Sequence, residues 1–127
     1  FYGQDKAHNP DGQRFVDRGL GAAVNKPAED GKFKVPTLRN IARTAPYMHN
    51  GYFTTLRGAV AFYNDRDVRQ RCPKDLPEAE ANRRKCWPAP EVAANVNTDE
   101  LGRLGLGERE VDDIVAFLRT LDDGYLK

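Results

Sequence analysis

The shortage of patterned apolar residues limits what this chain can fold into more than any other feature of its sequence. Of its 127 residues, 11 are glycine and 8 are proline, and residues 1–34 read as loop with at most one helical turn near residues 15–20. No stretch alternates apolar and polar residues for long enough to predict a strand. The sequence therefore predicts a mainly α domain in which short helices are joined by long loops.

Two helical signals flank a run of helix breakers. In VPTLRNIART, Pro36 takes a favoured first helical position and precedes Leu38 and Ile41, which predicts a short helix that ends before the next proline. After the HNG sequence at 49–51, Thr54 is a suitable N-cap for a second helix. The apolar face predicted for this helix comprises Leu56, Ala59, Val60 and Tyr63.

The most regular helical pattern lies near the end of the chain. The sequence EREVDDIVAFLRTLDDG has acidic residues in its first turns, as helix N-termini favour, and Gly124 is its predicted stop. Before it, VNTDELGRLGLG predicts a turn or short helix and a glycine-rich bend. The apolar stripe of this last helix comprises Val111, Ile114, Val115, Leu118 and Leu121.

The two cysteines predict a disulfide. Cys72 and Cys86 bracket a polar, proline-containing loop with little apolar content to hold its shape. In the entropic model, closing a loop of this size contributes about 3 kcal/mol. A disulfide indicates an oxidising compartment such as the bacterial periplasm, while two free thiols are the alternative. A zinc site is disfavoured, because neither cysteine lies in a CxxC and neither histidine has a suitable companion.

Charge and hydropathy exclude two classes of partner. The chain has 20 Lys and Arg residues against 19 Asp and Glu residues, a formal charge of +1, so no strong field favours nucleic acid. No apolar run approaches the roughly 20 residues of a membrane span. The start FYGQDKAHNPDG lacks the zones of a signal peptide and reads as mid-protein sequence. We expect one domain, or part of one, over residues 1–127.

One short stretch, TAPYMHNGYFTTLRGAVAFYND at 44–65, gathers a methionine, a histidine and several aromatic rings. These side chains either fill a core or surround a flat apolar group with a metal in its middle. Ordering the chain costs roughly 1 to 2 kcal/mol of conformational entropy per residue, which the burial of apolar surface must offset. About three short helices offer little apolar surface for this. A large apolar cofactor or a further portion of the same domain would make up this shortfall, and both point to haem proteins.

The runs GKFKVPTLRNIARTAPYMHNGYFTTLRGAVAFYN and LGLGEREVDDIVAFLRTL resemble the C-terminal haem domain of bacterial di-haem cytochrome c peroxidases, and more closely their MauG-type relatives. The resemblance is strong over residues 31–64 and 101–121, and CWPAPEVAANVN resembles the MauG-like branch. It implies that residues 1–127 form the C-terminal portion of a cytochrome c-like haem domain.

The haem attachment motif of that family is missing from this sequence. Family members attach each haem c through CxxCH, and no CxxCH occurs in these 127 residues. The resemblance therefore implies that the motif lies upstream of Phe1 in a parent polypeptide, which also carries the second haem domain. On this interpretation the chain supplies only the distal half of a haem pocket, and the isolated chain is inactive.

The resemblance implies that Tyr63 ligates the haem iron, because MauG-type proteins carry Tyr where the peroxidases carry Met. A phenolate is a hard anionic donor that lowers the reduction potential relative to a thioether, and a core tyrosine is the alternative. Met48 is a rival ligand, as in ordinary cytochromes c, unless it only fills the pocket wall. His49 is a third candidate, although its place before Asn50 is typical of a turn residue that bonds backbone or a haem propionate.

Other residues take secondary roles in the resemblance. Arg39 and Asn40 belong to a recurring LRN triplet, in which Arg39 bonds a propionate or forms a surface ion pair. Calcium between the haem domains implies backbone carbonyl ligands at Asn25 and Pro27. Residues expected to line the pocket or the core are Phe33, Leu38, Ile41, Tyr47, Phe53, Leu56 and Val60.

The implied function is the electron-transfer haem part of a periplasmic di-haem peroxidase or MauG-like oxidase. Its partners would be the remainder of the parent polypeptide and a redox partner protein or protein substrate. A non-enzymatic c-type cytochrome with Met48 as ligand is the main alternative, and a haem-free helical binding module is a third. The axial ligand separates the first two, since Tyr63 on the iron favours the oxidase and Met48 the carrier.

Overall fold

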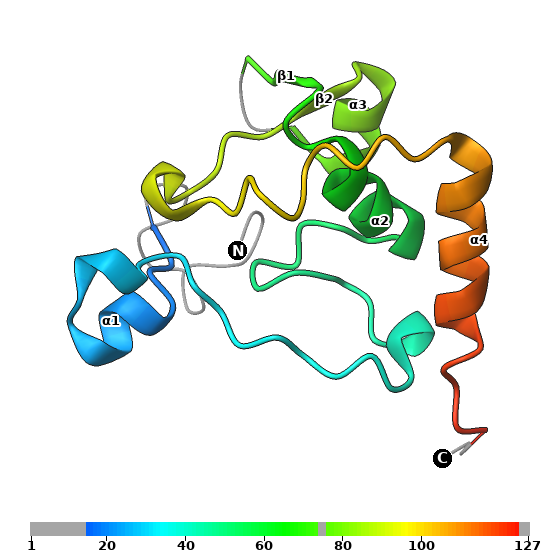
Figure 1. Ribbon diagram of the computed structural model, residues 1–127, viewed down its shortest axis with the longest axis horizontal. Coiled ribbons are helices and arrows are strands. Elements are labelled where there is room, and N and C mark those ends of the chain that lie inside the picture. Colours follow the sequence, from blue (N-terminus) through cyan, green and yellow to red (C-terminus); the bar gives the residue numbers. More distant parts are fainter. Residues whose placement is uncertain (1–14, 74–75, 125–127) are drawn as a thin grey trace.

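Short helices joined by long loops make up the described chain, as the sequence predicts (Figure 1). This computed structural model describes residues 15–73 and 76–124. Over these ranges no helix combines the length and apolarity that a membrane span needs. The elements are α1 at Leu20–Val24, α2 at Leu56–Asp65, β1 at Gln70–Arg71, α3 at Glu78–Arg83, β2 at Cys86–Trp87 and α4 at Glu108–Arg119, with 3-10 turns at Pro27–Glu29, Ile41–Arg43 and Ala93–Asn95.

Helix α2 lies at the centre of the fold, and its cap is one residue later than predicted. The hydroxyl of Thr55, rather than that of Thr54, accepts the N–H of Gly58 at 3.0 Å. The predicted apolar face is buried at Leu56, Ala59 and Val60. At Tyr63 the prediction differs from the structure, because 40% of this residue is exposed. The last turn of α2 thus leaves Tyr63 at the edge of the core.

Helix α4 packs against α2 through the predicted apolar stripe. Its Val111 and Val115 are buried against Leu56 and Val60 of α2, and the two helices lie side by side in Figure 1. The helix ends at Arg119, before the predicted stop at Gly124. Leu121 was predicted to belong to the apolar stripe. This prediction is wrong, because Leu121 lies beyond the end of the helix.

The predicted helix after Pro36 does not form. The structure has only the 3-10 turn Ile41–Arg43, because Asn40 adopts the left-handed conformation with φ of 58°. The backbone N–H of Asn40 donates to the Leu121 carbonyl at 2.8 Å, and its side-chain oxygen accepts the N–H of Asp123 at 3.0 Å. Contacts to the segment after α4 therefore replace the local helix.

The helical turn predicted near residues 15–20 lies instead at α1, five residues long from Leu20. Gly19 precedes it with φ of 51°, and its N–H donates to the Asp17 carboxylate at 2.9 Å. The strands β1 and β2 were not predicted, because two residues are too short to show an alternating pattern. They pair in parallel, with Gln70 opposite Cys86.

The disulfide between Cys72 and Cys86 forms as predicted. It closes a unit that we call the disulfide lobe, defined as residues 70–87, with β1, α3 and β2 in it. Trp87 is fully buried beside it, and its indole N–H donates to the Asp65 carboxylate at 2.7 Å. Asp65 also binds Arg69 at 2.6 Å, and the Arg69 guanidinium lies over the Trp87 ring. Asp65 therefore joins the lobe to α2.

A buried carboxylate makes the second link between the disulfide lobe and α2. Glu78 accepts hydrogen bonds at 2.6 Å from the N–H and hydroxyl of Thr54 and from the hydroxyl of Thr55. A side chain at position 58 would collide with the Glu78 carboxylate, which explains the glycine there. Glu78 thus stabilises the N-terminus of α2. The sequence around Glu78 did not predict this role.

Removing the disulfide should destabilise the protein without changing its helices. The Cys72→Ser/Cys86→Ser variant should lose about 3 kcal/mol of unfolding free energy, because the bond closes a loop with a sequence separation of 14. Urea unfolding followed by circular dichroism measures this loss. An unchanged midpoint would show that the links through Asp65 and Glu78 hold the lobe without the bond.

Glu78→Gln should destabilise the protein by about 1–3 kcal/mol, because the variant loses the charge and places an amide N–H beside hydroxyl and backbone donors. Glu80→Gln is the matched control, since Glu80 lies on the same helix and pairs with the exposed guanidinium groups of Arg83 and Arg84. Equal unfolding midpoints for the two variants would contradict the capping role of Glu78.

Candidate functional site

Two candidate ligand atoms meet at one point of the fold. The Tyr63 hydroxyl, near the end of α2, donates a hydrogen bond to the Met48 sulfur at 3.4 Å. Met48 begins the turn of residues 48–51 and is only partly buried. The sequence predicted Tyr63 and Met48 as rivals, and the fold brings them together.

The turn that carries Met48 is closed by backbone contacts on both sides. Tyr47 and Phe53 form an antiparallel bridge, in which the N–H of Tyr47 donates to the Phe53 carbonyl at 2.7 Å. Within the turn, the N–H of Gly51 donates to the Met48 carbonyl at 3.2 Å. Since Phe53 is buried against α2, the core fixes the base of this turn and hence the position of Met48.

Met48 also lines a half-open cavity of about 550 Å³. Tyr63 adjoins this cavity without lining it, through Met48 and through Phe62, whose ring centroid lies 6.2 Å from that of Tyr63. The aromatic part of the wall is Phe33, Tyr52, Phe53 and Phe62, and the charged part includes Lys32, His49, Arg66, Arg71 and Glu91. The volume and the mixed wall suit a large organic ligand with a few polar groups.

His49 is held in place by two neighbours at the cavity. Its ring stacks on Phe33, with centroids 3.9 Å apart, and its Nε2 lies 3.5 Å from the Glu91 carboxylate. Glu91 also accepts from the Asn50 amide at 3.0 Å and from the Asp17 N–H at 3.2 Å. His49 therefore behaves as the turn residue that its sequence position suggested, with a carboxylate as its partner.

Glu91 is a site residue that the sequence prediction missed. It joins three segments, around Asp17, the 48–51 turn and its own loop. One signal was present in the sequence, because Glu91 is the only charged residue between Lys85 and Asp99. Arg66 was missed as well, and it binds Asp67 at 2.6 Å and the Leu101 carbonyl at 3.3 Å beside the same cavity.

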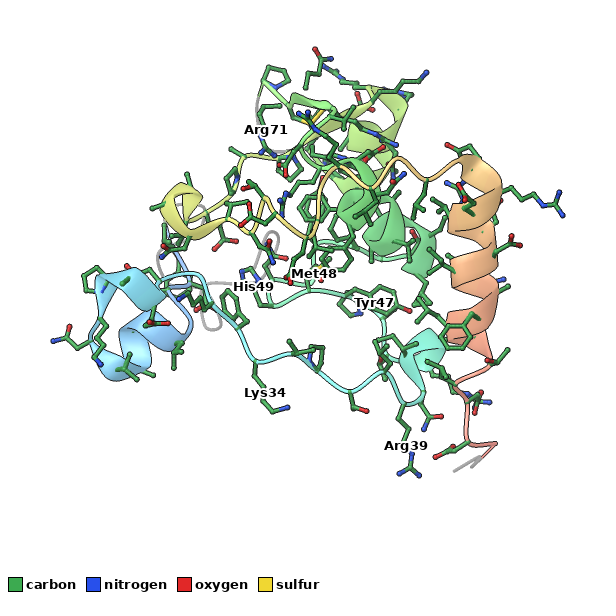
Figure 2. All side chains as sticks on the ribbon, viewed as in Figure 1. Lys34, Arg39, Tyr47, Met48, His49 and Arg71 are labelled. Carbon is green, nitrogen blue, oxygen red and sulfur yellow. A yellow bond between two sulfur atoms is a disulfide. The ribbon has the colours of Figure 1, made fainter. Side chains whose placement is uncertain are left out.

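Arg39 and Asn40 do not lie with the other predicted residues. The Arg39 guanidinium binds the Asp123 carboxylate at 2.6 Å, and its side chain is 71% exposed. Figure 2 shows it pointing away from Met48 and His49. In this chain, Arg39 thus forms the surface ion pair that was the alternative to a propionate contact.

The residues predicted for calcium lie next to α1. Asn25 follows this helix with φ of 52°. The carbonyl of Pro27 accepts the N–H of Asp30 at 3.1 Å and the amide of Asn95 at 3.3 Å. Over residues 15–73 and 76–124, no group of three or more His, Cys, Asp or Glu side chains could hold a metal ion.

Partial burial favours the neutral form of the Tyr63 phenol. Desolvation raises the pKa of Tyr63, and the nearby positive charge of Arg66 opposes this only in part. Desolvation also raises the pKa of Tyr47, whose hydroxyl donates to the Ile41 carbonyl at 3.0 Å. Tyr63 differs from Tyr47 in its hydrogen-bond partner, which is a sulfur and hence a weak acceptor. A metal ion could therefore replace this hydrogen bond at little cost in free energy.

The donor set and its surroundings fit a haem. Phenolate and thioether are both iron ligands in haem proteins, and they lie beside the aromatic wall formed by Phe53 and Phe62. The segment that borders the cavity leaves Phe33, Val35 and Leu38 exposed, with Val35 at 82%. Such an exposed apolar run is typical of a surface that another group or segment covers.

Known proteins with similar sequences are haem peroxidases and their relatives, although no family model matches the chain. The chain is 49% identical over 115 residues to the methylamine utilization protein MauG of Paracoccus denitrificans, which covers 88% of the chain. It is 36% identical over 118 residues, 91% of the chain, to the cytochrome-c peroxidase IdrP1 of Denitromonas iodatirespirans. The chain spans only 29% and 25% of the length of these two relatives.

A solved structure has the same fold. It is the crystal structure of a MauG-like protein associated with microbial copper homeostasis, with a TM-score of 0.64 and 30% identity. The match covers 84% of this chain and 27% of the other. The arrangement of short helices and long loops thus recurs as part of a longer protein.

Tyr63 and Tyr47 should ionise later than an unfolded tyrosine, whose pKa is about 10. Because the raised pKa values belong to the folded state, the stability that they contribute is complete below about pH 10 and is lost as the pH rises through the folded-state values. Absorbance titration of the haem-free chain should show that Tyr63→Phe and Tyr47→Phe each remove one late-ionising phenol. Loss of an early-ionising phenol in Tyr63→Phe would contradict this account.

Proposed function

Because the chain belongs to the family of MauG and the bacterial cytochrome c peroxidases, whose C-terminal region it matches, we propose that it forms the distal side of a c-type haem site with Tyr63 as the axial ligand of the iron. The observation that carries the proposal is the hydroxyl of the partly exposed Tyr63, which has the Met48 sulfur as its hydrogen-bond acceptor. A bound haem supplies reversible electron transfer at this position.

The residues around Tyr63 would bind and orient the haem through different interactions. Phe53 and Phe62 present an apolar wall, which would exclude water from one face of a bound haem. Desolvation raises the pKa of Tyr63, and the positive charge of Arg66 opposes this in part by favouring the ionised phenol, the form that would bind ferric iron. His49 and Arg71 line the charged part of the cavity, where they would meet carboxylates at the edge of the haem.

In this proposal the thioether bonds and the proximal ligand come from a CxxCH outside these residues. Both cysteines of the chain are used in the disulfide, so neither is free to bind a haem vinyl group. The remainder of a parent polypeptide would supply the CxxCH and the second haem domain. The exposed residues Val35 and Leu38 would then be covered by that polypeptide.

The activity that we propose for the parent protein is that of a di-haem peroxidase or MauG-like oxidase. Its oxidising equivalents would pass between this haem and a redox partner protein or protein substrate. The disulfide supports a periplasmic location, since such bonds persist in oxidising compartments. The 49% identity to a MauG protein and the tyrosine at position 63 favour the MauG-like branch.

Calcium is a further part of the proposal. The Asn25 and Pro27 carbonyls would donate to Ca²⁺, a cation that prefers oxygen ligands. The remaining ligands would come from the second haem domain. The Pro27 carbonyl already accepts two hydrogen bonds, so calcium would have to displace or share the longer one from Asn95.

A second function is a plain electron carrier with Met48 on the iron. The observation in its favour is that the Met48 sulfur lines the cavity and contacts Tyr63. A thioether ligand would raise the reduction potential relative to a phenolate. The axial ligand thus distinguishes the two functions.

Tyr63→Phe should change the ferric spectrum of the haem-loaded parent protein and raise its reduction potential, because a phenolate stabilises Fe(III). Electronic absorption, electron paramagnetic resonance and potentiometric titration measure the change. Tyr47→Phe is the matched control, because it removes a hydroxyl bonded to the Ile41 carbonyl and should leave the spectrum as it is. A ferric spectrum unaltered by Tyr63→Phe would reject Tyr63 as the ligand.

A further inference from the structure

Met48 and Tyr63 occupy one site, although they are separated by 15 positions in the sequence. Their donor atoms lie 3.4 Å apart, with the phenol O–H directed at the sulfur. A metal ion that binds one of these atoms therefore has the other close by. The two residues need not be competing explanations of a single ligand, since the fold makes both available at the same place.

The backbone at Met48 is in a conformation that its side chain does not favour. Its φ of 68° lies in the left-handed region, which is uncommon for residues other than glycine, asparagine and aspartate and costs on the order of 1–3 kcal/mol. Glycine would adopt it without strain. Met48 is also the one methionine of the chain. Packing alone therefore does not explain why a methionine stands at this position.

The Met48 side chain is only partly buried, although its backbone is held in place. The bridge between Tyr47 and Phe53 holds the base of the turn, while the side chain is partly buried at the edge of the Phe53 and Trp87 cluster and lines the open cavity. Methionine has three rotatable side-chain bonds and a polarisable sulfur. Rotation about these bonds would bring the sulfur toward the space beside Tyr63.

We propose that Met48 is a reserve ligand for the haem iron at Tyr63, which deepens the proposed function and depends on it. In the haem-free chain its sulfur accepts the Tyr63 O–H, a hydrogen bond that ends when the phenol loses its proton to bind ferric iron. When position 63 offers no oxygen, the Met48 sulfur becomes the axial ligand of the same iron.

Three variants of the haem-loaded parent protein test this. Tyr63→Phe should remain low-spin and should acquire the far-red absorption of a methionine-to-iron bond. Tyr63→Phe/Met48→Leu should lose that band, become high-spin and bind added imidazole or cyanide readily. Met48→Leu, which keeps the side-chain volume but removes the sulfur, should retain the phenolate-to-iron band, because an iron-bound phenolate has no proton to donate to the sulfur.

The outcomes separate this inference from the proposed function. If the Tyr63→Phe protein is high-spin and matches the double variant in spectrum and potential, the reserve role is overturned, while a wild-type phenolate band still supports Tyr63 as ligand. A wild-type methionine band that Met48→Leu abolishes would reject both Tyr63 ligation and the reserve role.

Discussion

The packing of α2 on two sides is the constraint on which the rest of the structure depends. One side meets α4 through Leu56 and Val60, and another meets the aromatic cluster of Phe53 and Trp87 through small alanines. Because both sides are occupied, the helix cannot turn about its axis. The residue at the boundary of its buried surface, Tyr63, is thereby held at the edge of the cavity.

Single carboxylates organise the loops that the small apolar core cannot hold. Asp65 accepts hydrogen bonds from Trp87 and Arg69, and Glu78 accepts hydrogen bonds from the two threonines before α2. Glu91 lies beside the His49 ring and accepts a hydrogen bond from the backbone N–H of Asp17. Each of these acids joins segments far apart in the sequence. A chain rich in loops can therefore keep one shape where hydrophobic contact is limited, since charge-assisted hydrogen bonds fix specific partners.

The sequence predicted what local pattern controls and missed what distant contacts control. The apolar spacing of residues 56–60 and 111–118 is sufficient to predict α2 and α4, and the disulfide is predicted from its loop. The helix after Pro36 was wrong because Asn40 bonds to Leu121 and Asp123 instead. Glu91 was missed for a similar reason, because its partners come from remote segments. Iron ligation by Tyr63 stays a prediction, and so does a role for Arg39 or Asn40 beside a haem.

The fixed orientation of α2 about its axis also restricts where residues can be inserted or deleted during evolution. Each residue advances a helix by about 100°, so inserting or deleting one position between Thr55 and Tyr63 would carry the phenol to another quadrant while the cap stayed in place. The connection between the two cysteines is fastened at both ends, so its exposed positions are under no such restraint, although Glu78 and the buried Leu76 and Ala81 within it are. Lineages that share this architecture should therefore vary at the exposed positions of the stapled loop and keep the interval from cap to phenol constant.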